Sequence, residues 1–241
     1  NGDLKSYREV NVGLTQKMFE SFLKSEARLF IYFSSVKAVI DETDELLEEG
    51  LKPNPKTAYG ISKREAEKFL LSQELPSGKK LVILRPTMIH GPGNSGSLLQ
   101  LYKFVAKGIP YPFGAFENQR SFLVIANLCK AVQEIIHSED FKGGIYHICD
   151  DEFLSTNRLI ELIGEVTGRK VKLWKVPRFA FKALAGLGDT LKLPFNSHIL
   201  GKLTADYKVS NQKLKEALGW EKMPVRAEEG IRRTVVAFRE D

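Results

Sequence analysis

The order of apolar and polar positions in the first half of the chain predicts helices and strands in alternation. Stretches with apolar residues at three- and four-residue steps are typical of helices, and two short continuous apolar runs are typical of strands buried on both faces. In chain order these are helix 4–25, strand 28–33, helix 58–72, strand 80–86 and helix 97–107. Because parallel strands need such crossovers, the pattern predicts an α/β fold with a doubly wound parallel sheet.

The second half is less regular and predicts a smaller α+β lobe that shares segments with the sheet. We expect Tyr111–Phe113 and Ser121–Ile125 to pair as a small sheet, and a helix with breaks over 179–193. The remaining predicted elements are helix 126–137, strand 144–149, helix 155–166, strand 171–176, and helices 210–218 and 226–239. The larger lobe is predicted to use 1–86 and 111–149, and the smaller lobe 87–110 and 150–241.

Composition places the chain among ordinary globular proteins. Of its 241 residues 43% are hydrophobic and 27% charged, which excludes a disordered or collagen-like chain. The net charge of +6 comes from dispersed Lys and Arg without a basic run, so we expect no nucleic-acid partner. No run of about 18 apolar residues predicts a membrane span. Cys129 and Cys149 lack the spacing of a metal site or a disulfide framework, which favours a reducing, cytoplasmic location.

The candidate chemistry lies where two predicted strands end and one predicted helix begins. Tyr59 and Lys63 stand four residues apart, so they share a helical face, and a cation beside a phenol favours the phenolate. Ser34 and Ser35 follow the strand 28–33, and ligands bind beyond the carboxyl ends of parallel strands. A hydroxyl at Ser35 could hold a substrate oxygen while Tyr59 moves its proton. The pattern also fits a surface Tyr/Lys pair and a solvated strand end.

These segments resemble the NAD-dependent epimerase/dehydratase family, a group of extended short-chain dehydrogenase/reductases that act on nucleotide sugars. Residues 11–15 are similar to its Asn-Val-x-Gly-Thr segment, 30–41 to its strand ending in Ser-Ser, and 55–63 to its Pro-x-x-x-Tyr-x-x-x-Lys segment. Residues 84–93 are similar to its Leu-Arg-Pro turn, 119–128 to its Arg-Asp-Phe block, and 218–220 to its Leu-Gly-Trp. The resemblance implies a partial Rossmann-like sheet, with 1–86 and 111–149 in the dinucleotide-binding domain.

The resemblance also implies roles for single residues. Tyr59 would be the catalytic acid/base, Lys63 would lower its pKa, and Ser35 would hydrogen-bond the reacting hydroxyl. Arg120 would pair with the substrate diphosphate, a task that suits a planar bidentate donor; a surface strand position is the alternative. The implied cofactor-binding residues are Asn11, Ser34, Tyr59, Lys63, Pro86 and Thr87. The implied substrate-binding residues are Ser35, Met88, His90 and Arg120.

The chain departs from the family pattern at several positions. Val36 and Lys37 stand where the family's dehydratases have Asp-Glu, so dehydration of the sugar is not expected. Met88 replaces an Asn and His90 a Tyr of the Leu-Arg-Pro turn, and His90 could equally be a turn residue. An Arg expected near the C-terminus is replaced, with His198 or Lys202 as the possible substitutes.

The glycine pattern of 91–96 reads as G-x-G-x-x-G, but we interpret it as the family's substrate-side turn, because Pro92 lacks the N–H that phosphate binding uses. The family's Gly-rich pyrophosphate turn would precede the helix with which this chain begins, by roughly 70 to 90 residues. We therefore expect a truncated enzyme, with N-terminal strands absent, that is inactive as it stands and binds NAD weakly or not at all. The apolar strand 30–33 would then expose an edge and favour a homo-oligomer.

The predicted function is an NAD- or NADP-dependent epimerase that moves hydride at C4 of a nucleotide-diphosphate sugar through a 4-keto intermediate, in polysaccharide biosynthesis. A 4-keto reductase or dehydrogenase of the same family would use the same residues. A non-catalytic binding or sensor module that keeps the fold is the third possibility. No metal is expected.

Overall fold

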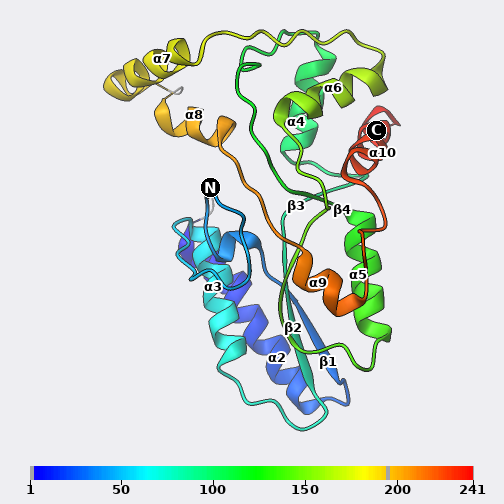
Figure 1. Ribbon diagram of the computed structural model, residues 1–241. Coiled ribbons are helices and arrows are strands. Elements are labelled where there is room, and N and C mark those ends of the chain that lie inside the picture. Colours follow the sequence, from blue (N-terminus) through cyan, green and yellow to red (C-terminus); the bar gives the residue numbers. More distant parts are fainter. Residues whose placement is uncertain (1–2, 194–195, 241) are drawn as a thin grey trace.

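The computed structural model describes residues 3–193 and 196–240 and shows an α/β chain built around a short parallel sheet (Figure 1). In chain order its elements are α1 (Leu4–Arg8), the π-helix η1 (Glu9–Gly13), α2 (Leu14–Lys24), β1 (Leu29–Phe33), the 3-10 helix η2 (Val36–Ala38), α3 (Ala58–Leu71), β2 (Lys80–Pro86), β3 (Met88–His90), α4 (Ser97–Ala106), β4 (Phe122–Val124), α5 (Ile125–His137), β5 (Gly144–Ile148), α6 (Thr156–Thr167), α7 (Arg178–Leu191), α8 (Ser197–Thr204), α9 (Gln212–Leu218) and α10 (Ala227–Glu240).

The main sheet has the order β1-β2-β5, and both pairings are parallel. Ile31 lies opposite Val82, and Val82 lies opposite Gly144, so the three strands end together at one edge of the sheet. The predicted α/β class and parallel sheet are therefore confirmed. The helix predicted over 4–25 is also present, with one turn widened into the π-helix η1.

Strand β2 is buried on both faces and feeds two cores, because successive side chains of a strand point to opposite sides. Leu81 and Ile83 pack with Phe19 and Leu70 of helices α2 and α3. Val82 and Leu84 pack on the other face, among residues of α5, β5 and α9. Figure 1 shows this arrangement, with α2 and α3 on one side of the sheet and α5 on the other. The continuous apolar run of β2 is the pattern that such double burial requires.

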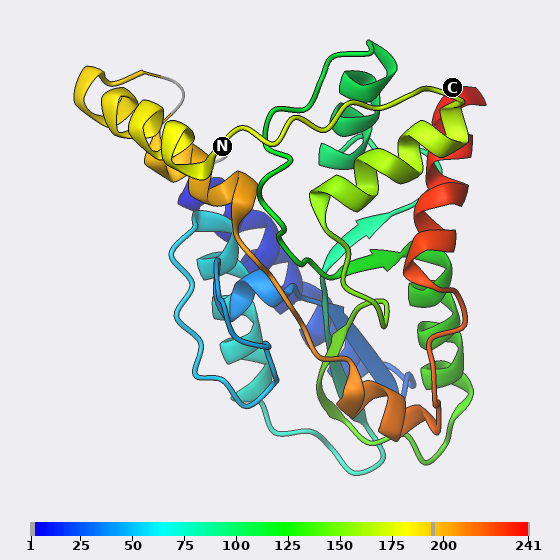
Figure 2. The same ribbon diagram turned by 45° about the horizontal axis from the view of Figure 1, so that its top comes forward.

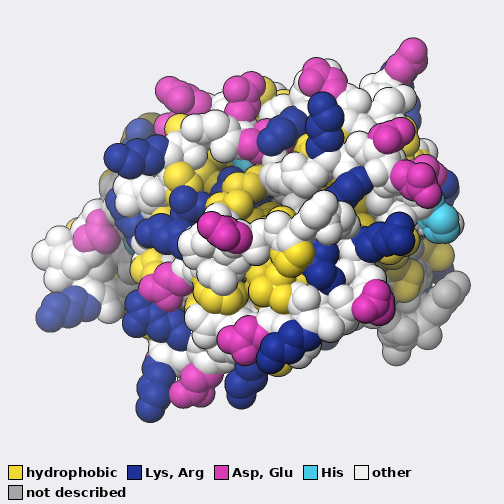
Figure 3. All heavy atoms as spheres, turned by 90° about the horizontal axis from the view of Figure 1, so that it is seen from below, with side chains coloured by type: hydrophobic (Ala, Val, Ile, Leu, Met, Phe, Trp, Pro, Cys, Tyr) yellow, Lys and Arg dark blue, Asp and Glu magenta, His cyan; other side chains and the backbone are white. Residues whose placement is uncertain are grey.

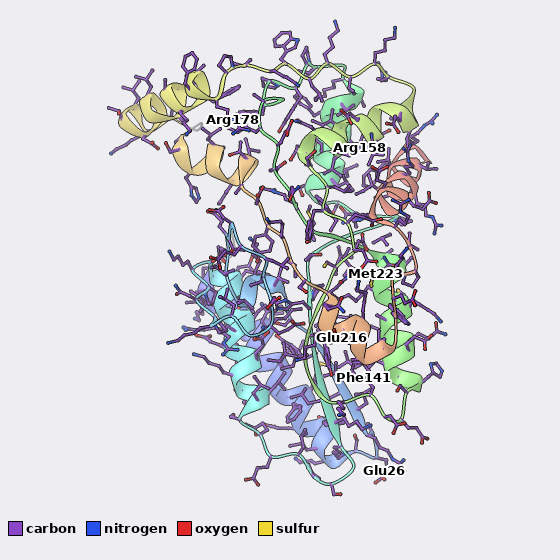
Figure 4. The ribbon with its side chains drawn as sticks, viewed as in Figure 1. Glu26, Phe141, Arg158, Arg178, Glu216 and Met223 are labelled. Atoms are coloured by element: carbon purple, nitrogen blue, oxygen red, sulfur yellow. The ribbon has the colours of Figure 1, made fainter. Side chains whose placement is uncertain are left out.

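A third core lies beyond the sheet, where β3 and β4 form a parallel pair. Helices α4, α6 and α10 meet there around Phe122 of β4, and Leu162, Ile231 and Val235 are fully buried. Figure 4 shows Arg158 of α6 in this region, where its guanidinium binds Glu228 of α10. The boundaries predicted for the two lobes stay a prediction.

The small sheet of the second half differs from the prediction. The segment 121–125 contributes β4, which pairs with β3 and not with Tyr111–Phe113. Tyr111 and Phe113 instead form isolated bridges to Leu173 and Lys175, and the strand predicted over 171–176 is reduced to these bridges. Both errors concern pairing partners far apart along the chain, which a local apolar pattern does not specify.

The helical region after residue 177 also differs. α7 runs from Arg178 to Leu191 without the predicted breaks. Ala185 and Gly188 are the buried residues of this helix, and α7 contacts α8. α8 was not predicted. Its first turn is capped by the Asn196 side chain, which accepts a hydrogen bond from the Ile199 N–H.

Candidate functional site

The site begins at the carboxyl ends of β1 and β2. Ser34 and Ser35 directly follow β1, and Thr87 follows β2; all three are buried. The Ser34 N–H donates to the Leu84 carbonyl at 2.8 Å, and the Thr87 N–H donates to the Ile148 carbonyl at 3.1 Å, so both turns are tied to the neighbouring strand. The Ser35 hydroxyl accepts from the Lys37 N–H at 3.2 Å and caps η2. The sequence-predicted hydroxyls therefore lie together on a rigid edge.

The first turn of α3 carries Tyr59 and is fixed by two side chains. The Thr57 hydroxyl caps the helix by accepting from the Gly60 N–H at 3.2 Å. Asp41, which belongs to the loop after β1, accepts hydrogen bonds from the Lys56 N–H at 2.6 Å, from the Thr57 N–H at 3.1 Å and from the Thr57 hydroxyl at 2.7 Å. An acidic group at a helix N-terminus is favourable, so Asp41 holds the start of α3 against the loop that follows Ser35.

Gly60 lets α3 approach that loop closely. A Cβ atom at Gly60 would lie 2.4 Å from the Lys37 carbonyl oxygen and 3.0 Å from the Pro55 Cβ. Side chains do not tolerate such distances, so only glycine permits this approach. The residue after Tyr59 thus brings the phenol next to Ser35.

A hydrogen-bonded chain supports Tyr59 from behind. The Asn11 amide donates to the Ser62 hydroxyl at 2.9 Å, and that hydroxyl donates to the Tyr59 carbonyl at 2.8 Å. Asn11 lies in the π-helix η1, a rare turn that often marks functional positions. Tyr7 adds an edge-to-face ring contact with Tyr59, at 5.8 Å between centroids. Asn11 therefore acts on the position of Tyr59 and lines neither of the cavities described next.

Two cavities meet at these residues. The Arg120 cavity has a volume of about 870 Å³, and the Lys63 cavity has about 560 Å³. Ser35, Tyr59 and Thr87 line both. The Arg120 cavity is further lined by Tyr7, Val36, Lys37, Asp41, Glu42, Thr57, Ala58, Met88, Arg120, Ser121, Phe122, Lys202, Ala205, Asp206 and Tyr207. The Lys63 cavity is completed by Phe33, Ser34, Lys63, Pro86, Ile89 and Leu128.

Burial is the largest influence on the pKa of Tyr59 and on that of Lys63. It raises the pKa of Tyr59 above its ordinary value, although a hydrogen bond with Ser35 acts in the opposite direction. Burial also lowers the pKa of Lys63. The Lys63 ammonium donates to the Phe33 carbonyl at 2.8 Å and lies 5.1 Å from the centroid of the Tyr32 ring. Within this chain Lys63 is thus engaged with the end of β1.

A buried ion pair lies directly behind Ser34. Glu67 of α3 accepts two hydrogen bonds from Arg85 of β2, both at 2.7 Å, one from the Ser34 hydroxyl at 2.6 Å and one from Arg64 at 3.0 Å. Burial opposes the ionisation of Glu67, but the hydrogen bonds and charge of Arg85 hold its pKa below the usual range. The pair joins α3, β2 and the end of β1 under the Lys63 cavity.

The predicted substrate residues are divided between cavity and core. Met88 and Arg120 line the Arg120 cavity. The Arg120 guanidinium donates to the carbonyls of Ala205, at 3.0 Å, and Lys202, so the C-terminal end of α8 fixes its position. Lys202, one of the two expected substitutes for a family arginine, lines the same cavity, whereas His198 does not.

His90 lies apart from the site. It is 1% exposed, its Nδ1 lies 2.9 Å from the Thr234 hydroxyl, and it lines neither cavity. The predicted contact of His90 with substrate is therefore corrected: its side chain packs between β3 and α10.

The glycines of 91–96 also do not line either cavity. A Cβ at Gly91 would lie 2.4 Å from Ile125, so this glycine serves the packing of the turn against α5.

Several cavity residues were missed by the sequence analysis. The sequence analysis named Lys37 only as a departure from the family pattern. In the structure its ammonium donates to the Asp41 carbonyl and lies 4.4 Å from the centroid of the Tyr207 ring. Burial lowers the pKa of Lys37. Tyr207 and Asp206 come from an irregular segment near the C-terminus that crosses the cavity, and no local pattern marks them. With Arg120 and Lys202, Lys37 gives this cavity three cationic side chains.

The Lys63 cavity has the features that the polar end of a dinucleotide requires. The Thr87 hydroxyl is buried and has no hydrogen-bond partner among the described residues, so it can bond to a ligand. Lys63 contributes an ammonium group to this cavity. An apolar wall is formed by Pro86, Ile89 and Leu128. These residues fit a nicotinamide and its ribose.

In the described part of the chain, no group of three or more His, Cys, Asp or Glu side chains could hold a metal, and no helix there is long and apolar enough to cross a membrane.

The chain is similar to known proteins in sequence and in fold. The model of the NAD dependent epimerase/dehydratase family matches residues 2–149. The chain is 32% identical over 238 residues to a UDP-glucose 4-epimerase of Vibrio cholerae, covering 98% of this chain and 70% of that protein. It is 27% identical to an N-acetyl-alpha-D-glucosaminyl-diphospho-ditrans,octacis-undecaprenol 4-epimerase of Escherichia coli O157:H7, covering 87% of this chain and 61% of that protein.

A solved structure shows the same fold. The UDP-glucuronic acid 4-epimerase of Bacillus cereus, in complex with UDP-glucuronic acid and NAD, superposes with a TM-score of 0.71 at 18% identity. The superposition covers 96% of this chain and 68% of that one. The protein belongs to the NAD-dependent epimerase/dehydratase family. Its relatives include a GDP-6-deoxy-D-mannose reductase of Pseudomonas aeruginosa beside the epimerases, and structures of the same fold have been solved with NAD or NADPH.

Proposed function

We propose that the protein epimerises a nucleotide-diphosphate sugar at C4, with NAD or NADP as cofactor. One observation carries the proposal: Ser35, Tyr59 and Thr87 form a common wall of the two cavities. A sugar in the Arg120 cavity and a nicotinamide in the Lys63 cavity would then meet at the Tyr59 phenol. The Vibrio cholerae relative, a UDP-glucose 4-epimerase, supports a UDP-sugar as the first substrate to test.

The residues of the wall supply the proton chemistry. Ser35 holds the C4 hydroxyl by a hydrogen bond, and Tyr59 accepts its proton as the alcohol becomes a ketone. A bound nicotinamide would accept the hydride from C4 and later return it to C4, and in its oxidised form it would carry a positive charge. When the 4-keto sugar presents its other face, Tyr59 returns the proton and the hydroxyl forms with inverted configuration. A positioned acid/base of this kind contributes about 10²- to 10⁴-fold to a rate.

Tyr59 needs an added cation to act as a base. In the chain alone, burial keeps its pKa above the ordinary value, so the phenol holds its proton. A drop to near neutrality requires about 4 kcal/mol of differential stabilisation. The hydrogen bond with Ser35 supplies a part of it, and the cofactor's charge would supply more. Tyr59 therefore becomes a base only when the cofactor is in place, which confines proton removal to the loaded enzyme.

The charged side chains of the Arg120 cavity fit the diphosphate. Arg120, Lys37 and Lys202 are cationic, and a guanidinium whose position is fixed by two carbonyls binds phosphate oxygens at little entropic cost. Val36 and Lys37 leave the end of β1 without the acid pair that dehydration uses, which supports epimerisation over loss of water.

The experiment compares Tyr59→Phe with the unchanged protein, expressed from its complete coding sequence with NAD added. The assay follows interconversion of UDP-glucose and UDP-galactose. We expect kcat to fall by about 10²- to 10⁴-fold with little change in KM, because the phenol is needed for the proton step. Tyr102→Phe is the matched control, since the Tyr102 ring packs on Phe238 in another core and should be neutral.

The outcomes separate the alternatives. Net oxidation of NADPH with a 4-keto sugar, without interconversion, would indicate a reductase that uses the same residues. Equal turnover of Tyr59→Phe and the unchanged protein would contradict both activities. Binding of UDP-sugar without any turnover would leave the non-catalytic module.

A further inference from the structure

Helices α7 and α8 form an arm that extends from the rest of the molecule. They pack on each other, and both ribbon views show α7 lying outside the layers of the sheet and its helices (Figures 1 and 2). Arg178, at the first residue of α7, anchors its start to the body through a hydrogen bond to the Ala115 carbonyl at 2.9 Å (Figure 4). We call residues 169–204 the arm segment; its first part, 169–177, runs along the body, where Tyr111 bridges Leu173, and its second part contains α7 and α8.

The outer face of α7 is apolar. Phe179, Ala183, Leu187 and Leu191 follow at four-residue steps, so they lie on one side of the helix, and Leu184 lies beside them. Phe179 is 74% exposed, Leu187 58% and Leu191 65%. The opposite side carries the buried Ala185 and Gly188. The exposed stripe is therefore a second apolar face, separate from the one that packs on α8.

The arm segment also carries the positive charge of the chain. Its 36 residues contain one acidic residue, Asp189, and eight basic ones: Arg169, Lys170, Lys172, Lys175, Arg178, Lys182, Lys192 and Lys202. The formal charge of the segment is thus +7, while that of the whole chain is +6, so the rest of the chain is close to neutral. Figure 3 shows the mixed character of another face, where Lys and Arg alternate with Asp and Glu.

We propose that the arm segment docks on an anionic lipid surface. An exposed stripe of Phe and Leu within a Lys/Arg-rich segment is the pattern by which helices lie in a membrane interface. Trp174, 55% exposed just before α7, adds the amphipathic ring favoured at that depth. With 14 residues, α7 is too short to span a bilayer, so it would lie on the surface.

Charge complementarity selects a bilayer over a second copy of the chain. Pairing two arms through their apolar stripes would bring two segments of charge +7 together, which like-charge repulsion opposes. An anionic lipid surface neutralises the same charge. Lys202 of α8 lines the Arg120 cavity, so a docked arm would hold that cavity close to the membrane. The inference does not depend on the reaction proposed above.

Vesicle flotation tests the proposal with the unchanged protein. Vesicles of phosphatidylcholine alone are compared with vesicles that also contain phosphatidylglycerol, at low and at high salt. We expect binding to the anionic vesicles only, weakened by salt, since screening reduces the charge term. Lys175→Gln and Lys182→Gln should each weaken binding about fivefold. Phe179→Ser, which removes the most exposed ring of the stripe, should weaken it about tenfold.

Matched controls lie outside the arm. Ile136→Ser removes an apolar side chain that is 58% exposed on α5, and Lys103→Gln removes an exposed charge on α4; neither should change vesicle binding. The proposal is overturned if the protein does not float with anionic vesicles, or if the arm and control variants behave alike. It is also overturned if Phe179→Ser abolishes a dimer seen by light scattering while vesicle binding is unchanged. Thermal unfolding of each variant shows that it has folded.

Discussion

Replacing Glu67 by Gln should destabilise the protein far more than an equally conservative change on its surface. Glu67 is fully buried, and Arg85, its partner, is 1% exposed. The substitution keeps the shape of the side chain but removes its charge, so the guanidinium of Arg85 stays buried without a counter-ion. Each carboxylate oxygen of Glu67 accepts two of the four hydrogen bonds, so the NH2 group of Gln would remove the acceptor of two of them.

The expected magnitude follows from burial. Breaking a buried pair by removing one partner costs about 3–5 kcal/mol, because it leaves an uncompensated charge. Glu65 gives the matched control on the same helix, since its partner Arg8 has a side chain that is 51% exposed. For such a surface pair Glu65→Gln should cost about 0–1 kcal/mol.

Urea unfolding measures both variants. We expect the midpoint of Glu67→Gln to fall while the m-value stays constant, which reports a change of stability alone. Glu67→Leu combined with Arg85→Met should recover much of the loss, because apolar replacement of both partners removes the buried charge. A Glu67→Gln variant that unfolds within about 1 kcal/mol of Glu65→Gln would refute the argument, since the pair would then contribute no more than an exposed one.

Two further predictions concern pH and a close contact. Burial, together with the charge of Arg85, lowers the pKa of His147 to about 3, so folding favours the neutral imidazole. The free energy of unfolding therefore keeps its full value at pH values above the ordinary pKa of about 6.5 and falls as the pH drops below it. Between about pH 7 and pH 5 this loss amounts to roughly 2 kcal/mol, and urea midpoints should show that His147→Gln removes it while the exposed His137→Gln does not. Gly60→Ala should lower both stability and turnover, because its Cβ would lie 2.4 Å from the Lys37 carbonyl oxygen and displace Tyr59. Gly50→Ala, with no atom within 4 Å of its Cβ, should leave both unchanged, and equal effects of the two would contradict this account.

Much of the site could be predicted because short stretches of sequence specify the strands and the helix that carry it. The apolar runs of β1 and β2 indicate where these strands end, and the ends of parallel strands share one edge of a sheet. The same reasoning placed Ser35, Tyr59 and Lys63 around one crevice, and in the structure all three line the Lys63 cavity. Their catalytic roles stay predictions.

Other features depend on contacts between distant segments. Asp41 reaches the start of α3 from an irregular loop, and Tyr207 crosses the Arg120 cavity from a segment near the C-terminus. Neither has a periodic pattern that would place it. His90 shows the reverse case, because a polar residue in a promising turn proved to be buried against Thr234.

The sequence by itself determined the α/β class and the edge of the sheet where polar side chains gather, because burial imposes a period on each strand and helix. Only the tertiary structure decided which of those side chains face a cavity. It paired β4 with β3, fixed Arg120 against the C-terminal end of α8 and left one face of α7 exposed. These outcomes rest on pairings between residues far apart along the chain, which local patterning does not encode.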